Sequence, residues 1–156
     1  MSEALKKLQR LEFEERYRNK PNYPDYAKVK TRYSDRTANG LTKCVLRFLQ
    51  ITGNHAERVN VTGRPIDRTK VVTNALGQQQ RIGSIEWLPT TGMKGSGDIH
   101  AVIKGRFVAI EVKMKDRQSE AQKEYQKQIE QAGGLYWLVR SFDEFIRLYN
   151  EIKARL

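Results

Sequence analysis

The Gly97–Lys113 segment constrains the fold of this chain most, because two short apolar runs meet there at Gly105. A glycine between two strand-like runs predicts a hairpin. Residues i and i+2 of a strand point to the same face, so Glu111 and Lys113 project together. Charged side chains in so apolar a strand are paired or bind something. The other residues of this strand are apolar, namely Phe107, Val108, Ala109, Ile110, Val112 and Met114.

The charged residues of the hairpin suit a site for a divalent cation. Asp98 opens the first strand and would converge with Glu111 and Lys113. Carboxylate oxygens are preferred ligands of Mg²⁺ and Mn²⁺, and such a metal beside a basic group suits phosphodiester hydrolysis. The alternative is a cross-strand ion-pair cluster of the same residues that only supports the hairpin.

The order of these residues resembles a known superfamily of nucleases. Asp98, twelve further residues and then Glu-Val-Lys resemble the PD-(D/E)XK motif, with Gly97 in place of its proline. A helix carrying Gln122, then Gly133–Gly134 and a short apolar strand are similar to the VRR-NUC branch. The resemblance is best from about Asn39 to Leu148, and the 53–63 segment is similar to the family's strand after its first core helix.

The resemblance implies a role for each residue of the motif. Asp98, Glu111 and the backbone carbonyl of Val112 would hold the metal. Lys113 would orient or deprotonate a water, or stabilise the negative charge that develops on the phosphate. Gln122 would lie near the metal, although Ser-x-x-Gln at a helix start is also a capping box that structure alone explains.

The chain departs from the family pattern in its first core helix. Related nucleases often supply an acidic residue there, but no Asp or Glu occurs from Ala38 to Asn54. Asn39, near the matching position, is a neutral ligand, and Glu57 on the next strand is either a substitute carboxylate or part of an exposed ion pair. One-metal hydrolysis is therefore expected.

The composition favours a polyanionic partner. The length of 156 residues suits one domain. The formal net charge of +11, with 30% charged residues, favours electrostatic attraction to nucleic acid. The chain has no apolar run long enough to cross a membrane and only one cysteine, Cys44, within an apolar helical stripe. We expect no membrane partner, a core thiol and a cytoplasmic location in a bacterial or phage-infected cell.

Further residues are candidates for contacts with the DNA backbone, and each has a plainer interpretation. The 89–97 loop is Gly-rich, which either serves phosphate binding or only allows close packing. A single histidine on the hairpin is either a phosphate contact or a packed neighbour, and the basic residues either bind phosphate or form a solvated surface. The candidates are Lys94, Ser96, His100, Arg58, Lys115 and Arg117.

The predicted fold is α/β, with a restriction-endonuclease-like core in which helices flank a mixed central sheet. Residues 1–38 are expected to form an exposed helix and basic arm, and 39–156 the nuclease-like domain. The periodicity predicts helices over Asn39–Thr52, from Ser119 to Ala132 and after Ser141. It predicts strands over His55–Val61, Arg81–Leu88, Asp98–Lys104, Arg106–Lys115 and Leu135–Val139, with Trp87, Tyr136 and Trp137 as core or interface aromatics.

The function expected from these observations is metal-dependent endonuclease action on DNA. By resemblance, the substrate is branched or structured DNA such as a Holliday junction, in replication, repair or recombination of a phage or mobile element. A homodimer would bring two sites to two strands. The alternatives are a nucleic-acid-binding protein with a weak or inactive site, and a toxin or restriction-type nuclease with sequence specificity.

Overall fold

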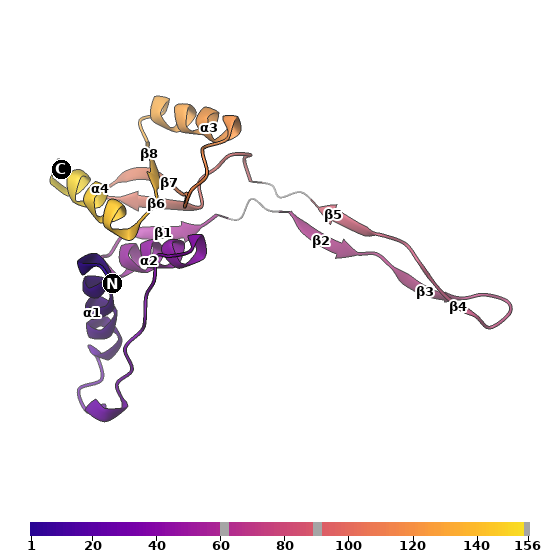
Figure 1. Ribbon diagram of the computed structural model, residues 1–156, viewed down its shortest axis with the longest axis horizontal. Coiled ribbons are helices and arrows are strands. Elements are labelled where there is room, and N and C mark those ends of the chain that lie inside the picture. Colours follow the sequence, from indigo (N-terminus) through magenta and orange to yellow (C-terminus); the bar gives the residue numbers. More distant parts are fainter. Residues whose placement is uncertain (60–62, 89–91, 155–156) are drawn as a thin grey trace. The chain divides into compact units, whose positions relative to one another are not determined.

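The computed structural model describes residues 1–59, 63–88 and 92–154 and divides into two compact units. One unit comprises Met1–Val59 with Lys94–Leu156, and the other comprises Asn60–Met93. Figure 1 shows the elements of each. The units do not divide at residue 38, where the sequence suggested a boundary, because the first helix belongs to the larger unit.

The larger unit is an α/β structure with a mixed sheet, as predicted. Its sheet has the order β1-β6-β7-β8, in which β1, β6 and β7 are antiparallel and β8 is parallel to β7. Within the described residues, the strands are β1 (His55–Arg58), β6 (Ile99–Ile103), β7 (Arg106–Val112) and β8 (Leu135–Val139). The helices are α1 (Glu3–Tyr17), α2 (Ala38–Ile51), α3 (Glu120–Gln131) and α4 (Phe142–Ala154), with a short 3₁₀ turn, η1 (Asp25–Ala27).

The two faces of this sheet are covered unequally. On one face, α1, α2 and α4 pack over a large apolar core. On the other face, α3 covers a small cluster formed by Ala109, Tyr125 and Tyr136. Successive residues of a strand point to opposite faces of the sheet, so Val108 and Ile110 of β7 enter the large core while Ala109 and Glu111 point to the face that α3 covers. The candidate site therefore belongs to the thinly covered face.

The expected helices and strands of this unit match the structure closely. The apolar stripe of α2 is buried, including Cys44, whose thiol pKa is raised to about 11, mainly by burial. The hairpin forms between Ile103 and Arg106, and β8 has the predicted bounds. Val61, the expected end of the β1 region, lies outside the described residues.

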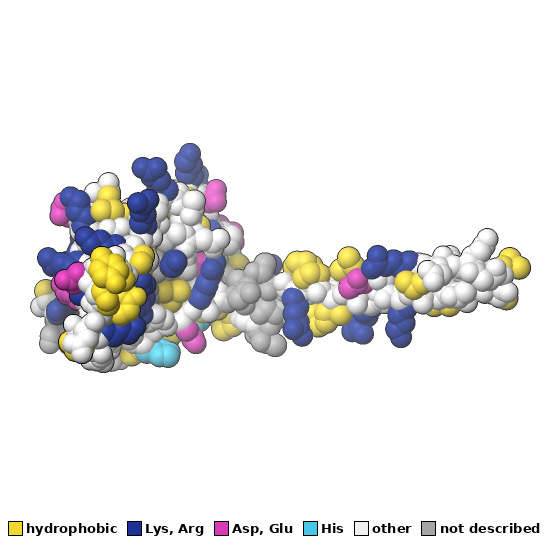
Figure 2. All heavy atoms as spheres, turned by 90° about the horizontal axis from the view of Figure 1, so that it is seen from below, with side chains coloured by type: hydrophobic (Ala, Val, Ile, Leu, Met, Phe, Trp, Pro, Cys, Tyr) yellow, Lys and Arg dark blue, Asp and Glu magenta, His cyan; other side chains and the backbone are white. Residues whose placement is uncertain are grey.

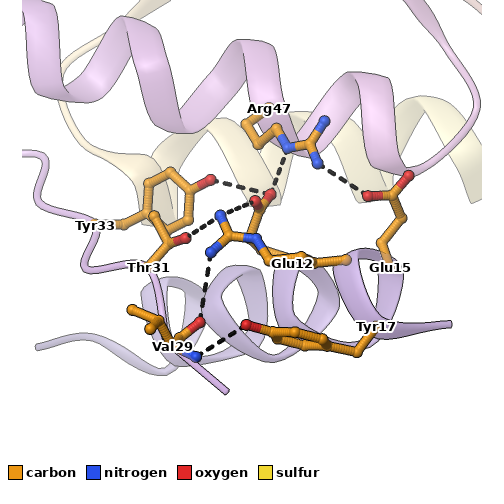
Figure 3. A network of polar contacts seen from close by, with 8 residues as sticks. Glu12, Glu15, Tyr17, Val29, Thr31, Tyr33 and Arg47 are labelled. Atoms are coloured by element: carbon orange, nitrogen blue, oxygen red, sulfur yellow. Dashed lines mark hydrogen bonds and ion pairs between the residues drawn. The ribbon is translucent and has the colours of Figure 1, made fainter. Parts of the chain in front are cut away.

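The prediction of an exposed N-terminal arm is wrong for α1. Leu5 and Leu8 are buried, because even a thin leucine stripe suffices where two helices offer an apolar surface. Glu12 is buried as well, and it accepts hydrogen bonds from Arg16 and Arg47 and from the hydroxyl of Tyr33 (Figure 3). This network fastens α1 to α2 and to the 29–33 segment.

The smaller unit is a long two-stranded ribbon. Its inner half pairs β2 (Arg64–Asp67) with β5 (Ile85–Leu88), and its outer half pairs β3 (Lys70–Thr73) with β4 (Gln79–Ile82). The sequence suggested one strand over Arg81–Leu88 and an irregular excursion before it. The structure has two strands there, separated at Gly83 and Ser84. Trp87 is not a core residue, since 60% of it is exposed.

Across the described ranges, every helix is too short or too polar to span a bilayer.

Candidate metal and catalytic site

Two carboxylates from neighbouring strands form the centre of the candidate site. Asp98 precedes β6 directly, and one of its carboxylate oxygens accepts a hydrogen bond of 2.9 Å from the backbone amide of Val112. Glu111 lies on β7 on the same face and is only 4% exposed. The antiparallel register pairs Ile99 with Ile110, which brings Asp98 opposite Glu111. Sequence reasoning anticipated this convergence.

Lys113 and Gln122 both contact Glu111. The Lys113 ammonium lies 3.3 Å from Oε1 of Glu111, as expected for residues two apart on a strand. The side-chain amide of Gln122, in the first turn of α3, donates a hydrogen bond to the same oxygen. The structure thus brings together the four predicted catalytic residues, Asp98, Glu111, Lys113 and Gln122.

Gln122 is a capping residue, as one interpretation of the sequence predicted, and it also contacts Glu111. Its carbonyl oxygen accepts a 2.9 Å bond from the backbone amide of Ser119, whose hydroxyl accepts a 3.3 Å bond from the amide of Gln122. This is a complete capping box. The cap fixes the Gln122 side chain so that its NH₂ group points at Glu111. The capping interaction is therefore compatible with a place for Gln122 beside the candidate site.

The environment of Glu111 disfavours its negative charge. Burial raises the pKa of this carboxyl, and the neighbouring Asp98 raises it further, while Lys113 and Gln122 act in the opposite direction. The net direction is upward. The carboxylates of Asp98 and Glu111 lie close together and Glu111 is buried, so the one ammonium group beside them, that of Lys113, does not fully offset the unfavourable burial and repulsion of their negative charges. A divalent cation between the two carboxylates would supply further positive charge.

A glycine loop packs tightly against this cluster. A Cβ on Gly95, whose φ is +87°, would lie 2.3 Å from the carbonyl oxygen of Ala121, and one on Gly97 would lie 2.8 Å from that of Ile110. Between them, Ser96 is buried, and within the described residues its hydroxyl has no hydrogen-bond partner. The loop thus inserts an unsatisfied oxygen between the start of α3 and β7.

The residues present fit a hard divalent cation. Two carboxylates and a buried hydroxyl are oxygen donors of the kind that Mg²⁺ and Mn²⁺ bind. No three Asp, Glu, His or Cys side chains gather in residues 1–59, 63–88 and 92–154, so Asp98 and Glu111 are the acidic part of the cluster. The backbone of Val112, expected as a ligand through its carbonyl, is held beside Asp98 through its amide.

His100 is a packed neighbour of the site with a tyrosine partner. Its Nε2 lies 3.1 Å from the hydroxyl of Tyr125, and its ring packs on Phe107. Burial lowers the pKa of the imidazole, and Glu57, its partner across the β1–β6 pairing, offsets this in part. At neutral pH the histidine is therefore mainly uncharged.

The sequence did not connect two tyrosines with the site. Tyr136 is buried, as a core or interface aromatic should be, and it forms a small cluster with Ala109 and with Tyr125, which lies on α3. Burial raises the pKa of Tyr136 to about 12, and the charges of Glu111 and Asp98 contribute to that rise. The signal for Tyr136 was its place on a strand parallel to β7, but the register of two strands separated by a helix is not readable from the sequence.

The other predicted contact residues lie at the surface. The guanidinium of Arg58 donates a 2.8 Å bond to the side-chain oxygen of Asn39. Glu57 is exposed. Lys94, Lys115 and Arg117 are also exposed.

Comparison of the chain with models of protein families, with curated proteins and with solved structures found no match.

Proposed function

We propose that this chain is a metal-dependent deoxyribonuclease with a restriction-endonuclease-like core. The observation that carries the proposal is the buried Glu111 carboxylate, which faces Asp98 and is contacted by Lys113 and Gln122. An ion-pair cluster that only supported the hairpin would not need a second carboxylate that raises the pKa of the first. The net charge of +11 favours a nucleic-acid substrate.

Asp98 and Glu111 would hold Mg²⁺ or Mn²⁺, with the Val112 carbonyl and the Ser96 hydroxyl as further oxygen donors. When bound, the metal polarises a phosphoryl oxygen and lowers the pKa of water. Lys113 orients the attacking water and stabilises the negative charge that grows on the phosphate oxygens. Gln122 keeps Glu111 in place through its amide and is itself fixed by the helix cap.

The proposed substrate is branched or structured DNA, on the strength of the family resemblance. A symmetric junction needs two cuts on two strands, which a homodimer with two-fold symmetry supplies. Replication, repair or recombination in a phage or mobile element is the corresponding setting.

A second candidate is a DNA-binding protein with a weak or inactive site. The observation that favours it is that α2 carries no acidic residue, and that Asn39, near the position at which the resembled family often has one, is bonded to Arg58. Without that ligand, the described residues of the cluster offer only two carboxylates to a metal.

The test is cleavage of labelled four-way junction, flap, single-stranded and duplex DNA with Mg²⁺, with Mn²⁺ and with EDTA. Asp98→Asn and Lys113→Ala are expected to abolish metal-dependent cutting. Asp143→Asn, on α4 on the other face of the sheet, is the matched control and retains it. Tight, salt-sensitive binding without any cutting would select the second candidate.

A further inference from the structure

The two faces of the ribbon of residues 63–88 differ in charge, and both carry apolar side chains. Alternation places Arg64, Arg68 and Lys70 on one face, which also carries Glu86 and the apolar residues Ile66, Val72, Ile82 and Leu88. The other face carries Asp67 and Arg81, which form an ion pair of 3.3 Å, together with Pro65, Val71, Ile85 and Trp87. A backbone bond from Arg68 to Ser84 joins the inner and outer halves into one continuous ribbon.

This ribbon has no core of its own. None of residues 63–88 is buried, and a lone two-stranded ribbon is marginally stable in water. Large apolar side chains along it are open to solvent, which is typical of a surface that binds a partner. They are Val71 (63%), Val72 (44%), Leu76 (84%), Ile82 (48%), Ile85 (67%) and Trp87 (60%).

The charges of the ribbon favour an anionic partner. The two acidic residues, Asp67 and Glu86, lie in the inner half, and each is paired with an arginine. From Arg68 to Ile85 the sequence contains no acid but three cations. Figure 2 shows Lys and Arg side chains standing out along the ribbon, with hydrophobic side chains between them. Two of these cations, Arg68 and Arg81, are the ion-pair partners of Glu86 and Asp67. The ribbon as a whole carries four cations and two acids, and this net positive charge suits a polyanion.

The outer half also concentrates side-chain amides. Asn74, Gln78, Gln79 and Gln80 surround the turn. The Asn74 side chain is engaged within the turn, since its oxygen accepts bonds from the amides of Leu76 and Gln78 and its NH₂ group donates to the Gln78 side chain, so Gln79 and Gln80 are the candidates for base contacts. Amide side chains can read adenine edges, and cations contact phosphates or guanine. The major groove of B-DNA admits a two-stranded ribbon.

We propose that the ribbon of residues 63–88 enters the major groove of duplex DNA, with Arg68, Lys70 and Arg81 on the phosphates or base edges and the amides at the turn facing the groove. The partner class rests on the proposed function. A second copy of this chain fits less well, because two acid-free outer halves would bring like charges together.

The test is the affinity of the full chain for a duplex of about 30 base pairs in EDTA, measured by fluorescence anisotropy at several salt concentrations. The ribbon variant is Arg68→Gln/Lys70→Gln/Arg81→Gln. The matched control, Lys6→Gln/Lys7→Gln/Arg10→Gln, also removes three positive charges, but from the exposed surface of α1. For the ribbon variant, we expect the slope of log K against log salt to fall by about 0.9 for each phosphate that the ribbon no longer neutralises, with a much smaller change for the control.

Quenching of tryptophan fluorescence gives a second readout. Trp87 is 60% exposed and Trp137 is 8% exposed, so acrylamide reports mainly on the ribbon. Duplex DNA is expected to protect Trp87 in the wild type. Protection that follows protein concentration and not DNA would assign the ribbon to a second copy and overturn the proposal.

The outcomes separate this proposal from the nuclease activity, since the binding is measured in EDTA. Equal weakening by the ribbon and control variants, in a protein that cuts DNA, overturns the ribbon proposal alone. Binding that depends on the ribbon in a protein that never cuts overturns the nuclease and keeps the ribbon. Absence of duplex binding by the wild type overturns the ribbon proposal, and cleavage of the other substrates then decides the nuclease.

Discussion

Glu111 is a charged residue in a largely apolar strand, and its surroundings disfavour its negative charge. It is 4% exposed, close to Asp98, and its pKa is raised by burial first and by that neighbour second. A carboxyl with a raised folded pKa contributes stability below its unfolded pKa and loses that contribution as the pH rises through the folded value. At neutral pH, the ionised carboxylate of Glu111 therefore lowers the stability of the metal-free protein.

Replacing Glu111 with Gln is therefore expected to stabilise the metal-free protein at neutral pH. The gain in melting temperature should vanish below about pH 4.5, where the wild-type carboxyl is protonated in both states. Thermal melts in EDTA across this range check it, with Glu124→Gln on the surface of α3 as the control. A gain that does not change with pH would contradict the argument.

The same variant should also lose the response to metal. If Glu111 holds Mg²⁺, metal at about ten times its dissociation constant stabilises the wild type by about 1.4 kcal/mol. Glu111→Gln is expected to show little of this shift in a melt, whether or not DNA is cut. An equal shift in both proteins would place the metal elsewhere.

Variants of Ser119 and Gln122 distinguish the effect of helix capping on stability from an effect on the rate of cleavage. Ser119→Ala removes half of the capping box and should cost about 1 kcal/mol while the rate of cleavage changes little. Gln122→Ala removes the other half together with the bond to Glu111, so it should cost a similar free energy and also lower the rate. Urea unfolding and single-turnover cleavage, measured side by side, distinguish the two effects. Similar rates for both variants would make Gln122 a capping residue only.

At the scale of elements, hydrophobic periodicity predicted the sheet and the helices that cover it. The stripe of α2, the β6–β7 hairpin and β8 each bury residues at the expected period. The exposure expected of α1 was wrong, because its burial depends on surfaces of α2 and α4 far away in the sequence. The candidate site was predictable for Asp98, Glu111 and Lys113, since the strand period aligns Glu111 with Lys113 and the short hairpin turn brings Asp98 opposite Glu111. The place of Tyr136 beside the site was not, because it follows from the register of β8 against β7.

The network around Glu12 is expected to stabilise the packing of α1. Burial raises the pKa of this carboxyl, but hydrogen bonds from Arg47 and Arg16 outweigh it and lower the pKa overall. Glu12→Gln leaves two arginines without their carboxylate, and because these are 32% and 37% exposed, the cost is discounted to about 2 kcal/mol.

The cost should depend on pH with the opposite sign to that of Glu111. A lowered folded pKa contributes stability above the unfolded value of 4.5 and loses it as the pH falls through the folded pKa. Urea midpoints of wild type and Glu12→Gln are therefore expected to converge in acid. Glu15→Gln, which loses only a partly exposed pair with Arg47, is the control. A constant difference at every pH would refute the ionic contribution.

At the scale of the whole molecule, the chain consists of an α/β unit and a ribbon with no core. The ribbon was only partly predictable, because strands that bury nothing show no contrast between inward and outward residues. Its turn signals and polar residues looked like those of an irregular loop. The polar residues and the lack of an apolar period in the sequence agree with the structure, in which both faces of the ribbon are exposed to solvent.

Shortening the ribbon should leave the α/β unit intact. Asp67 and Ile85 are paired across the ribbon, so Asn-Gly can replace residues 68–84 as a two-residue hairpin turn. Because the large core contains no residue of that segment, the melting temperature and the near-ultraviolet circular dichroism should change little. A large loss of stability would show that the ribbon supports the fold.

The single cysteine has a practical consequence for spectroscopy. Cys44 is fully enclosed and its pKa is about 11, so at neutral pH hardly any of it is the reactive thiolate. A cysteine introduced at Leu76, at the exposed turn of the ribbon, would therefore accept a maleimide dye or a nitroxide spin label in the otherwise natural chain. The distance from that label to one on the end of a DNA duplex can then be followed in solution without first removing the native thiol.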